Sequence, residues 1–99
     1  MSSTRYVFRK VNLPDGRHLA IYDYKGDRDS VPSSERWRNI ELIAVDGSVV
    51  WQVQPHEMIG SPFVEAFVKD GKIELINFDG WAFSLNLHTG EIVPIEERR

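Results

Sequence analysis

The segment Phe63–Ile95 decides the fold, and it reads FVEAFVKDGKIELINFDGWAFSLNLHTGEIVPI. Three turn signals divide it into runs of strand length: Asp70-Gly71, Asp79-Gly80 and Thr89-Gly90. Apolar and polar residues alternate within the runs, most regularly over Trp81–Leu87, and this is typical of a half-buried strand. The segment therefore predicts a meander of antiparallel strands. We expect these strands over Phe63–Lys69, Lys72–Phe78, Trp81–Leu87 and Glu91–Ile95.

Asp-Gly pairs are the strongest turn signal in the whole chain. The pair occurs at Asp15-Gly16, Asp46-Gly47, Asp70-Gly71 and Asp79-Gly80. A two-residue hairpin loop of the mirror-image type needs positive φ at both central residues. Glycine adopts positive φ freely, and aspartate tolerates it better than most residues. Each pair between alternating apolar runs therefore predicts a tight β-hairpin.

The N-terminal half follows the same pattern, with two interruptions. We expect strands over Arg5–Val11, Arg17–Lys25, Arg38–Val45 and Ser48–Gln54. Gly26–Trp37 is polar and long for a hairpin loop, and a short helical turn is expected after Ser33, with this serine as its cap. Pro55–Pro62 joins the two halves, because its prolines resist incorporation into a central strand.

Phe63–Val68 also fits a short helix. Phe63 and Phe67 are spaced as neighbours on a helix face, and so are Val64 and Val68. Only about two helical turns would be available, and an isolated helix of that length is marginal. The Asp-Gly pair that follows favours the strand.

The fold class that follows is all-β, an antiparallel meander of about eight strands. At 99 residues the chain is expected to form a single domain, with halves at about 5–54 and 63–95. Two four-stranded sheets can stack as a sandwich or close into an irregular barrel, and the sequence leaves both open. The aromatic residues expected in the core are Trp51, Phe63 or Phe67, Phe78, Trp81 and Phe83.

Composition narrows the cellular setting and the class of partner. The chain has no cysteine, which favours a reducing compartment, and no apolar run approaches the roughly 18 residues of a membrane span. No signal peptide is visible, so we expect a cytoplasmic protein that does not enter a membrane. The formal net charge of −3 gives no electrostatic reason to expect nucleic-acid binding.

From about residue 42 to residue 93 the chain resembles the blade repeat of quinoprotein-type (PQQ-like) β-propellers. The pieces that carry the resemblance are Gly47-Ser48-Val49-Val50-Trp51, Ser61-Pro62-Phe63-Val64, Asp70-Gly71-Lys72-Ile73, Asp79-Gly80-Trp81 and Thr89-Gly90-Glu91-Ile92-Val93. The resemblance implies a pair of propeller-blade-like sheets. It departs from the family after Glu91, where no tryptophan completes the repeat.

Propellers carry roughly four to eight blades, and this chain has material for two at most. The quinone cofactor of that family sits on a complete propeller, so no cofactor is expected here. Open sheet edges must be covered or paired. Because propeller blades normally pack against other blades, we expect that this chain could self-associate, for example as a homodimer.

Few residues suggest catalysis. The three histidines, His18, His56 and His88, lie far apart and lack the spacing of a zinc motif, so no metal site is expected. His56 and Glu57 in the joining segment, together with His88, are the remaining candidates for a ligand or acid–base site. No cysteine nucleophile, Gly-x-Ser-x-Gly elbow or glycine-rich phosphate loop is present. Catalytic activity stays open, and the balance favours a protein that is not an enzyme.

Aromatic and arginine side chains are the candidates for recognising a partner. Tyr22 and Tyr24 share a strand face, while Arg36, Trp37 and Arg38 end the long polar loop. Tyrosine and tryptophan combine a large apolar area with a polar tip and are favoured at recognition surfaces. The sequence also allows that Trp37 folds back onto the core. The function predicted is a small protein-binding or regulatory module. The alternatives are a small-molecule binder or enzyme with its site in a barrel mouth or sheet crevice, and a self-assembling structural unit.

Overall fold

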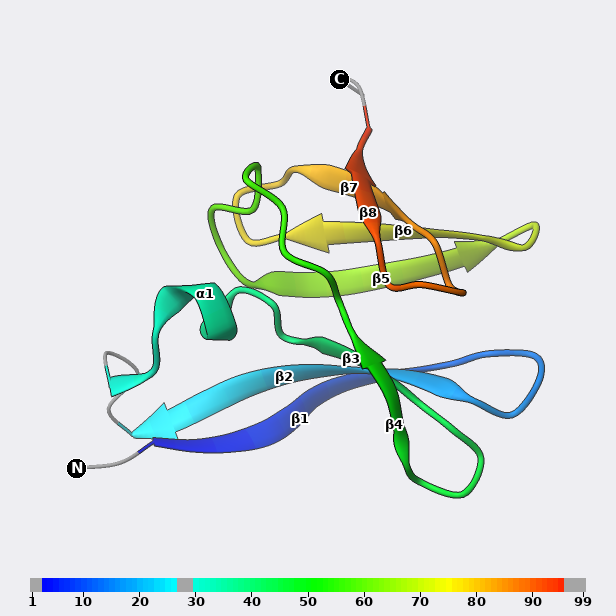
Figure 1. Ribbon diagram of the computed structural model, residues 1–99, viewed down its shortest axis with the longest axis horizontal. Coiled ribbons are helices and arrows are strands. Elements are labelled where there is room, and N and C mark those ends of the chain that lie inside the picture. The colour runs from blue at the N-terminus through cyan, green and yellow to red at the C-terminus, as the bar shows by residue number, and fades with distance from the viewer. Residues whose placement is uncertain (1–2, 27–29, 96–99) are drawn as a thin grey trace.

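The computed structural model describes residues 3–26 and 30–95, and this part of the chain forms eight strands and one short helix (Figure 1). The elements are β1 (Ser3–Asn12), β2 (His18–Gly26), α1 (Ser33–Arg36), β3 (Ile40–Ile43), β4 (Val49–Gln52), β5 (Phe63–Lys69), β6 (Lys72–Asn77), β7 (Ala82–Leu85) and β8 (Ile92–Pro94). The all-β prediction is confirmed, and so is the choice of a strand over a helix for Phe63–Val68.

The strands form two four-stranded antiparallel sheets, each a meander in sequence order. The first sheet has the order β1-β2-β3-β4 and the second β5-β6-β7-β8. The sheets lie one above the other in Figure 1, and the irregular segment 53–62 connects the end of the first sheet to the start of the second. The arrangement is consistent with two blade-like units.

The turn at Asp70-Gly71 is the two-residue mirror-image turn that the sequence predicts. Asp70 has φ 53° and Gly71 has φ 76°, and the loop is closed by the pairing of Lys69 with Lys72. Asp70 is the one residue other than glycine with positive φ in the described ranges.

The other three Asp-Gly pairs form hairpins of a different turn type. Only their glycines have positive φ, as at Gly16 with φ 94°. The N–H of Gly16 donates to the carbonyl of Leu13, and the N–H of Leu13 donates to the carbonyl of Arg17, so the loop has three residues. The extra residue lets Asp15 keep an ordinary φ, and its carboxylate accepts the backbone N–H of Arg17.

The core lies between the two sheets and is built from the inward-facing residues of both. Phe63 and Phe83 lie in its centre, nearly free of solvent, and their rings meet edge to face at a centroid distance of 5.6 Å. The other buried members of this cluster are Leu13, Leu19, Ile21, Ile40, Leu42, Val53, Ile59, Ala66, Ile73, Leu75, Leu85 and Ile92.

Two aromatic residues expected in the core, Phe78 and Trp81, are instead exposed, and of the alternatives Phe63 and Phe67 it is Phe63 that lies in the core. Phe67 is 54% exposed, Phe78 76% and Trp81 48%. Phe67 lies on the outer face of its strand, paired with Glu74. Ile73, Leu75 and Asn77 alternate along the chain and all face the core. Phe78 comes directly after Asn77, so its side chain points to the opposite side, away from the core.

Asn39 joins the two sheets in the interior. Its side-chain amide donates to the carbonyls of Tyr22 at 2.8 Å and Phe63 at 2.9 Å, and its oxygen accepts the N–H of Phe63 at 2.9 Å. Tyr22 belongs to the first sheet and Phe63 to the second. Buried backbone groups need such partners, so this asparagine fixes β5 against β2.

A second joint lies where Trp51 meets the turn after β7. The indole Nε1 donates to the carbonyl of Leu87 at 2.9 Å, and the N–H of Gln54 donates to the carbonyl of Gly90 at 2.8 Å. A Cβ at Gly90 would lie 2.9 Å from the Trp51 ring. The indole of Trp51 therefore packs directly against the backbone of Gly90, where a larger residue would clash with the ring.

Candidate functional site

The aromatic hollow is a cavity of about 270 Å³ near the end of β2. We use this name for the space lined by Tyr22, Asp23, Tyr24, Arg36, Trp37, Pro62 and Phe78. These residues come from β2, from α1 and its C-terminal cap, from the segment before β5, and from the turn after β6. Four of the five predicted partner-binding residues thus lie at one site, and Arg38 is the exception.

Helix α1 carries Arg36 and Trp37 to the hollow. The carbonyl of Pro32 accepts the N–H groups of Glu35 and Arg36, and the carbonyl of Ser33 accepts that of Trp37. The predicted serine cap is wrong, because Pro32 is the N-cap and no side chain caps the helix. In Figure 1, α1 lies on the side of β2 that faces the second sheet.

Trp37 is half-buried and lies between the hydrophobic core and the aromatic hollow. It packs against the hydrophobic core and also lines the aromatic hollow. Pro62 and the exposed Phe78 line the same space from the second sheet's side. The N–H of Phe78 donates to the carbonyl of Pro62 at 2.8 Å, which holds these two residues together.

Tyr22 is held in a polar cluster across three strands. Its hydroxyl donates to Glu41 at 2.8 Å, and the guanidinium of Arg5 lies 3.9 Å from its ring centroid. Arg5 Nη1 also bonds the second oxygen of Glu41 at 3.3 Å. Burial, followed by the hydrogen bond to Glu41 and that residue's charge, raises the pKa of Tyr22 above its ordinary value.

Tyr24 is largely covered. It is only 7% exposed, and burial is the first cause that raises its pKa. Neighbouring residues of a strand point to opposite faces, so Asp23 and the two tyrosines cannot all point into the hollow. Tyr22 and Tyr24 therefore do not form the open aromatic patch that the sequence allows, because Tyr24 is buried and Tyr22 is half-buried with its hydroxyl bonded to Glu41.

Arg36 has an unusual environment. The residue is half-buried, and its buried Nε atom has no hydrogen-bond partner among the described residues. Asp23 lines the same hollow but its oxygens are engaged: one accepts the hydroxyl of Tyr6 at 3.3 Å and the other the N–H of Tyr24 at 2.8 Å. The hollow thus combines an apolar wall with a guanidinium whose buried Nε has no acceptor among the described residues.

Arg38 does not line the aromatic hollow and instead makes hydrogen bonds that hold neighbouring segments of the fold together. Its Nε donates to the carbonyl of Val53 at 2.8 Å, and its own carbonyl accepts the side chain of Gln52 at 2.8 Å. It lines a second cavity of about 240 Å³, together with Ser33, Ser34, Trp37, Pro55, His56, Glu57 and Ile59.

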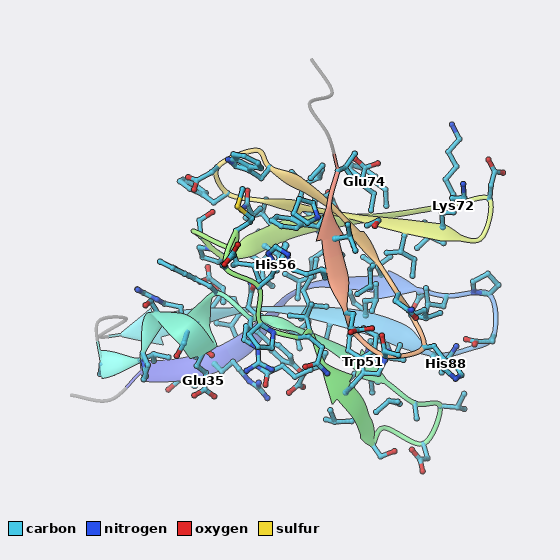
Figure 2. All side chains as sticks on the ribbon, turned by 45° about the horizontal axis from the view of Figure 1, so that its top comes forward. Glu35, Trp51, His56, Lys72, Glu74 and His88 are labelled. Atoms are coloured by element: carbon cyan, nitrogen blue, oxygen red, sulfur yellow. The ribbon has the colours of Figure 1, made fainter. Side chains whose placement is uncertain are left out.

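The candidate acid–base residues are not brought together. His56 Nδ1 accepts the N–H of Met58 at 3.0 Å, and its ring meets the edge of Phe83 at 6.3 Å. His88 is exposed in the turn after β7, where its N–H donates to the side chain of Asn86. Figure 2 shows His88 beside Trp51 and away from His56. His56 and Glu57 share the second cavity, with no hydrogen bond between them among the described contacts.

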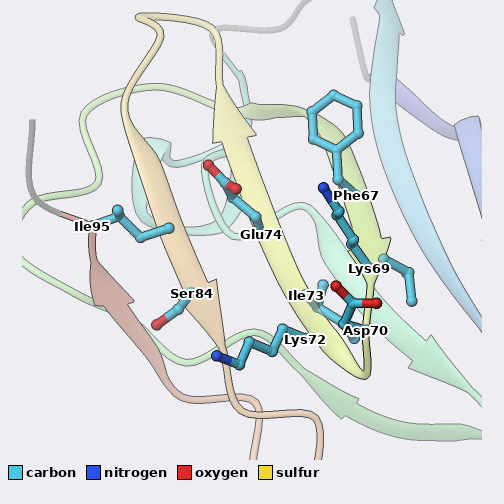
Figure 3. Close-up of a pocket in the computed structure, with 9 residues that line it drawn as sticks. Phe67, Lys69, Asp70, Lys72, Ile73, Glu74, Ser84 and Ile95 are labelled. Atoms are coloured by element: carbon cyan, nitrogen blue, oxygen red, sulfur yellow. The ribbon is translucent and has the colours of Figure 1, made fainter. Parts of the chain in front are cut away.

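A third, shallow depression of about 650 Å³ lies on the outer face of the second sheet. Figure 3 shows Glu74 on β6 flanked by Phe67 and Lys69 on one side and by Ser84 and Ile95 on the other. Charges of both signs are mixed with apolar side chains, and no single chemistry dominates this face.

Within residues 3–26 and 30–95, no group of three or more His, Cys, Asp or Glu side chains could hold a metal ion. No helix in these ranges is long and apolar enough to cross a membrane.

Comparison of the chain with protein-family models, curated proteins and solved structures found no match.

Proposed function

We propose that the protein is a small non-catalytic binding module that recognises a peptide segment of another protein in the aromatic hollow. The observation that carries this proposal is the convergence of Trp37, Pro62 and Phe78, from three separate segments, on one cavity beside Arg36. Aromatic residues and arginine dominate the energetics of recognition surfaces. Phe78, at 76% exposed, is a large apolar side chain that a ligand would cover.

The size of the hollow favours a peptide side chain over a cofactor. Sites for drug-sized ligands enclose about 300–1,000 Å³. The aromatic hollow, at about 270 Å³, falls just below that range and is open to solvent at Phe78. One or two side chains of an extended segment fit such a space.

The walls are held before any ligand arrives. Trp37 packs on the core, and Phe78 and Pro62 are tied by a backbone hydrogen bond. A preformed surface loses little conformational entropy on binding, which favours recognition. The separation of His56 from His88 supports binding over acid–base catalysis.

Selection from a phage-displayed library of random twelve-residue peptides tests the proposal. The wild-type protein is the bait, and the retained phage are then tested for binding to Phe78→Ala. Because Phe78 is largely exposed, this variant is expected to fold normally, which circular dichroism checks. We expect a shared sequence pattern among the retained peptides. Absence of any enriched pattern, or equal binding to Phe78→Ala, overturns the proposal.

Phe67→Ala is the matched control. It removes the same side chain from an exposed position on the outer face of the second sheet, where Phe67 is 54% exposed. Peptides that require the hollow bind this variant as they bind the wild type.

A second candidate is a self-assembling unit of quinoprotein-type propeller blades. Phe67 and Val93, 54% and 61% exposed, lie on the outer face of the second sheet, where a propeller blade would meet its neighbour. Light scattering coupled to size-exclusion chromatography tests it. A mass of several chains that falls to one chain in Phe67→Ala supports the proposal, and a single chain at all concentrations rejects it.

A further inference from the structure

The five arginines in the described ranges differ in whether the guanidinium has a hydrogen-bond or ion-pair acceptor. Four of them have an acceptor within the protein, whereas the buried Nε of Arg36 has none among the described residues. The four pairs are Arg5 with Glu41 at 3.3 Å, Arg9 with Glu65 at 3.5 Å, Arg17 with Asp15 at 2.6 Å, and Arg38 with the carbonyl of Val53 at 2.8 Å. Arg36 also lines the aromatic hollow, whereas none of these four does.

A buried guanidinium Nε without an acceptor carries a cost. Removing a charged donor from water without a hydrogen-bond partner is unfavourable, and native structures contain few such groups. No ion pair joins Arg36 to a carboxylate in the described ranges. Asp23 is engaged by Tyr6 and by the N–H of Tyr24, and Glu35, which is exposed, precedes Arg36 on the helix.

We propose that the segment bound in the aromatic hollow carries a carboxylate next to an aromatic or proline side chain, and that Arg36 binds this carboxylate. The inference rests on the proposed function and names the chemistry of its ligand. The apolar side chain contacts Trp37, Pro62 and Phe78, while the acidic group pairs with the guanidinium. The planar fork of arginine suits a carboxylate better than the point charge of lysine does.

This chemistry gives the site its specificity. A neutral ligand of the same shape would fill the apolar wall but would leave the Nε of Arg36 without an acceptor. An acidic ligand satisfies both parts of the hollow. The partner class is therefore an acidic segment with an aromatic residue or proline beside the acid.

Phenylacetate and phenylacetamide are matched probes, because they share the ring and differ in charge. Their binding is measured from the indole N–H signal of Trp37 in ¹⁵N-labelled protein, assigned with Trp37→Phe. The indole of Trp51, which donates to the carbonyl of Leu87 outside the hollow, is the internal reference. We expect phenylacetate to move the Trp37 signal saturably, with an affinity about tenfold higher than that of phenylacetamide.

Two variants separate the charge from the apolar wall. Arg36→Gln reduces the preference for phenylacetate to near onefold, and Phe78→Ala weakens both probes. Equal affinity of the wild type for both probes overturns the inference, as does a preference that survives in Arg36→Gln. Failure of both probes also overturns it. The peptide selection described above is independent of probe charge, so it shows separately whether the hollow binds peptides at all.

Discussion

At the scale of single residues, Asn39 shows how one buried side chain can couple two sheets. Its amide group satisfies one backbone carbonyl in each sheet and one backbone N–H in the second sheet. Sequence alone places Asn39 in a predicted strand after Arg38 and gives no sign of these contacts, since its partners are 17 and 24 residues away in the chain.

Replacement of Asn39 by alanine is expected to lower the free energy of unfolding by about 3 kcal/mol, because it leaves several buried backbone groups without partners. Urea denaturation monitored by tryptophan fluorescence measures the loss. Asn86→Ala is the matched control, since Asn86 accepts N–H groups only in an exposed turn, and its cost should be about 1 kcal/mol. Equal losses in the two variants would contradict the role of Asn39.

Tyr22 predicts how stability changes at alkaline pH. Burial and Glu41 raise its pKa in the folded protein above the ordinary value of 10.0. The neutral phenol is thus favoured by folding, so its contribution to stability is complete below about pH 10 and is lost as pH rises through the folded pKa. Tyr22→Phe should therefore lose less free energy of unfolding than the wild type between pH 8 and pH 11. Urea titrations at both values test this, and parallel losses would refute it.

The candidate site shows where sequence reasoning succeeds and where it ends. The composition of the long loop and of β2 directs attention to Tyr22, Tyr24, Arg36 and Trp37, and the structure places all four around one hollow. Phe78 was expected in the core. Its exposure follows from the position of Asn77, a polar residue in an inward-facing position, which the alternation of apolar residues does not predict.

At the scale of elements, the turns are the best-predicted feature. Every Asp-Gly pair lies in a hairpin turn because glycine supplies the positive φ that the chain reversal needs. The two-residue mirror-image turn was predicted correctly only at Asp70-Gly71, and the other three Asp-Gly pairs have positive φ at glycine alone. Loop length decides it, and the sequence does not show where each strand's hydrogen bonding ends.

Gly90 gives a test of the joint between β4 and the second sheet. Gly90→Ala places a Cβ 2.9 Å from the Trp51 ring at φ 82°, while the Cβ of Gly80→Ala meets nothing within 4 Å at φ 89°. Both variants carry the strain of positive φ, about 1 kcal/mol. Gly90→Ala should cost about 2 kcal/mol more, by the steric displacement of Trp51. Thermal and urea unfolding measure the difference, and similar stabilities would show that the indole moves freely.

The sheet edges are built to resist pairing with other strands. β1 carries Arg5, Arg9 and Lys10 and has a register shift between Val7 and Arg9. β8 is only three residues long and ends at Pro94. Charges, bulges, short length and proline all discourage edge-to-edge association. Assembly of this chain through the edges at β1 and β8 is therefore not expected.

At the scale of the whole molecule, the two sheets depend on each other. The core draws on both inner faces, and Asn39 and Trp51 tie the sheets through backbone groups. The sequence predicts the strands of each meander but leaves open how the sheets pack, because contacts such as Trp51 with Leu87 span 36 residues. The aromatic hollow exists only because the first sheet's β2 and α1 meet Pro62 and Phe78 of the second half.

The most direct test of the central claim is the affinity of one selected peptide for three proteins, measured by isothermal titration calorimetry. The wild type and Phe67→Ala should bind the peptide equally, and Phe78→Ala should bind it at least tenfold more weakly, since a buried aromatic contact is lost. Equal affinity of Phe78→Ala and the wild type would contradict the claim that the aromatic hollow is the binding site.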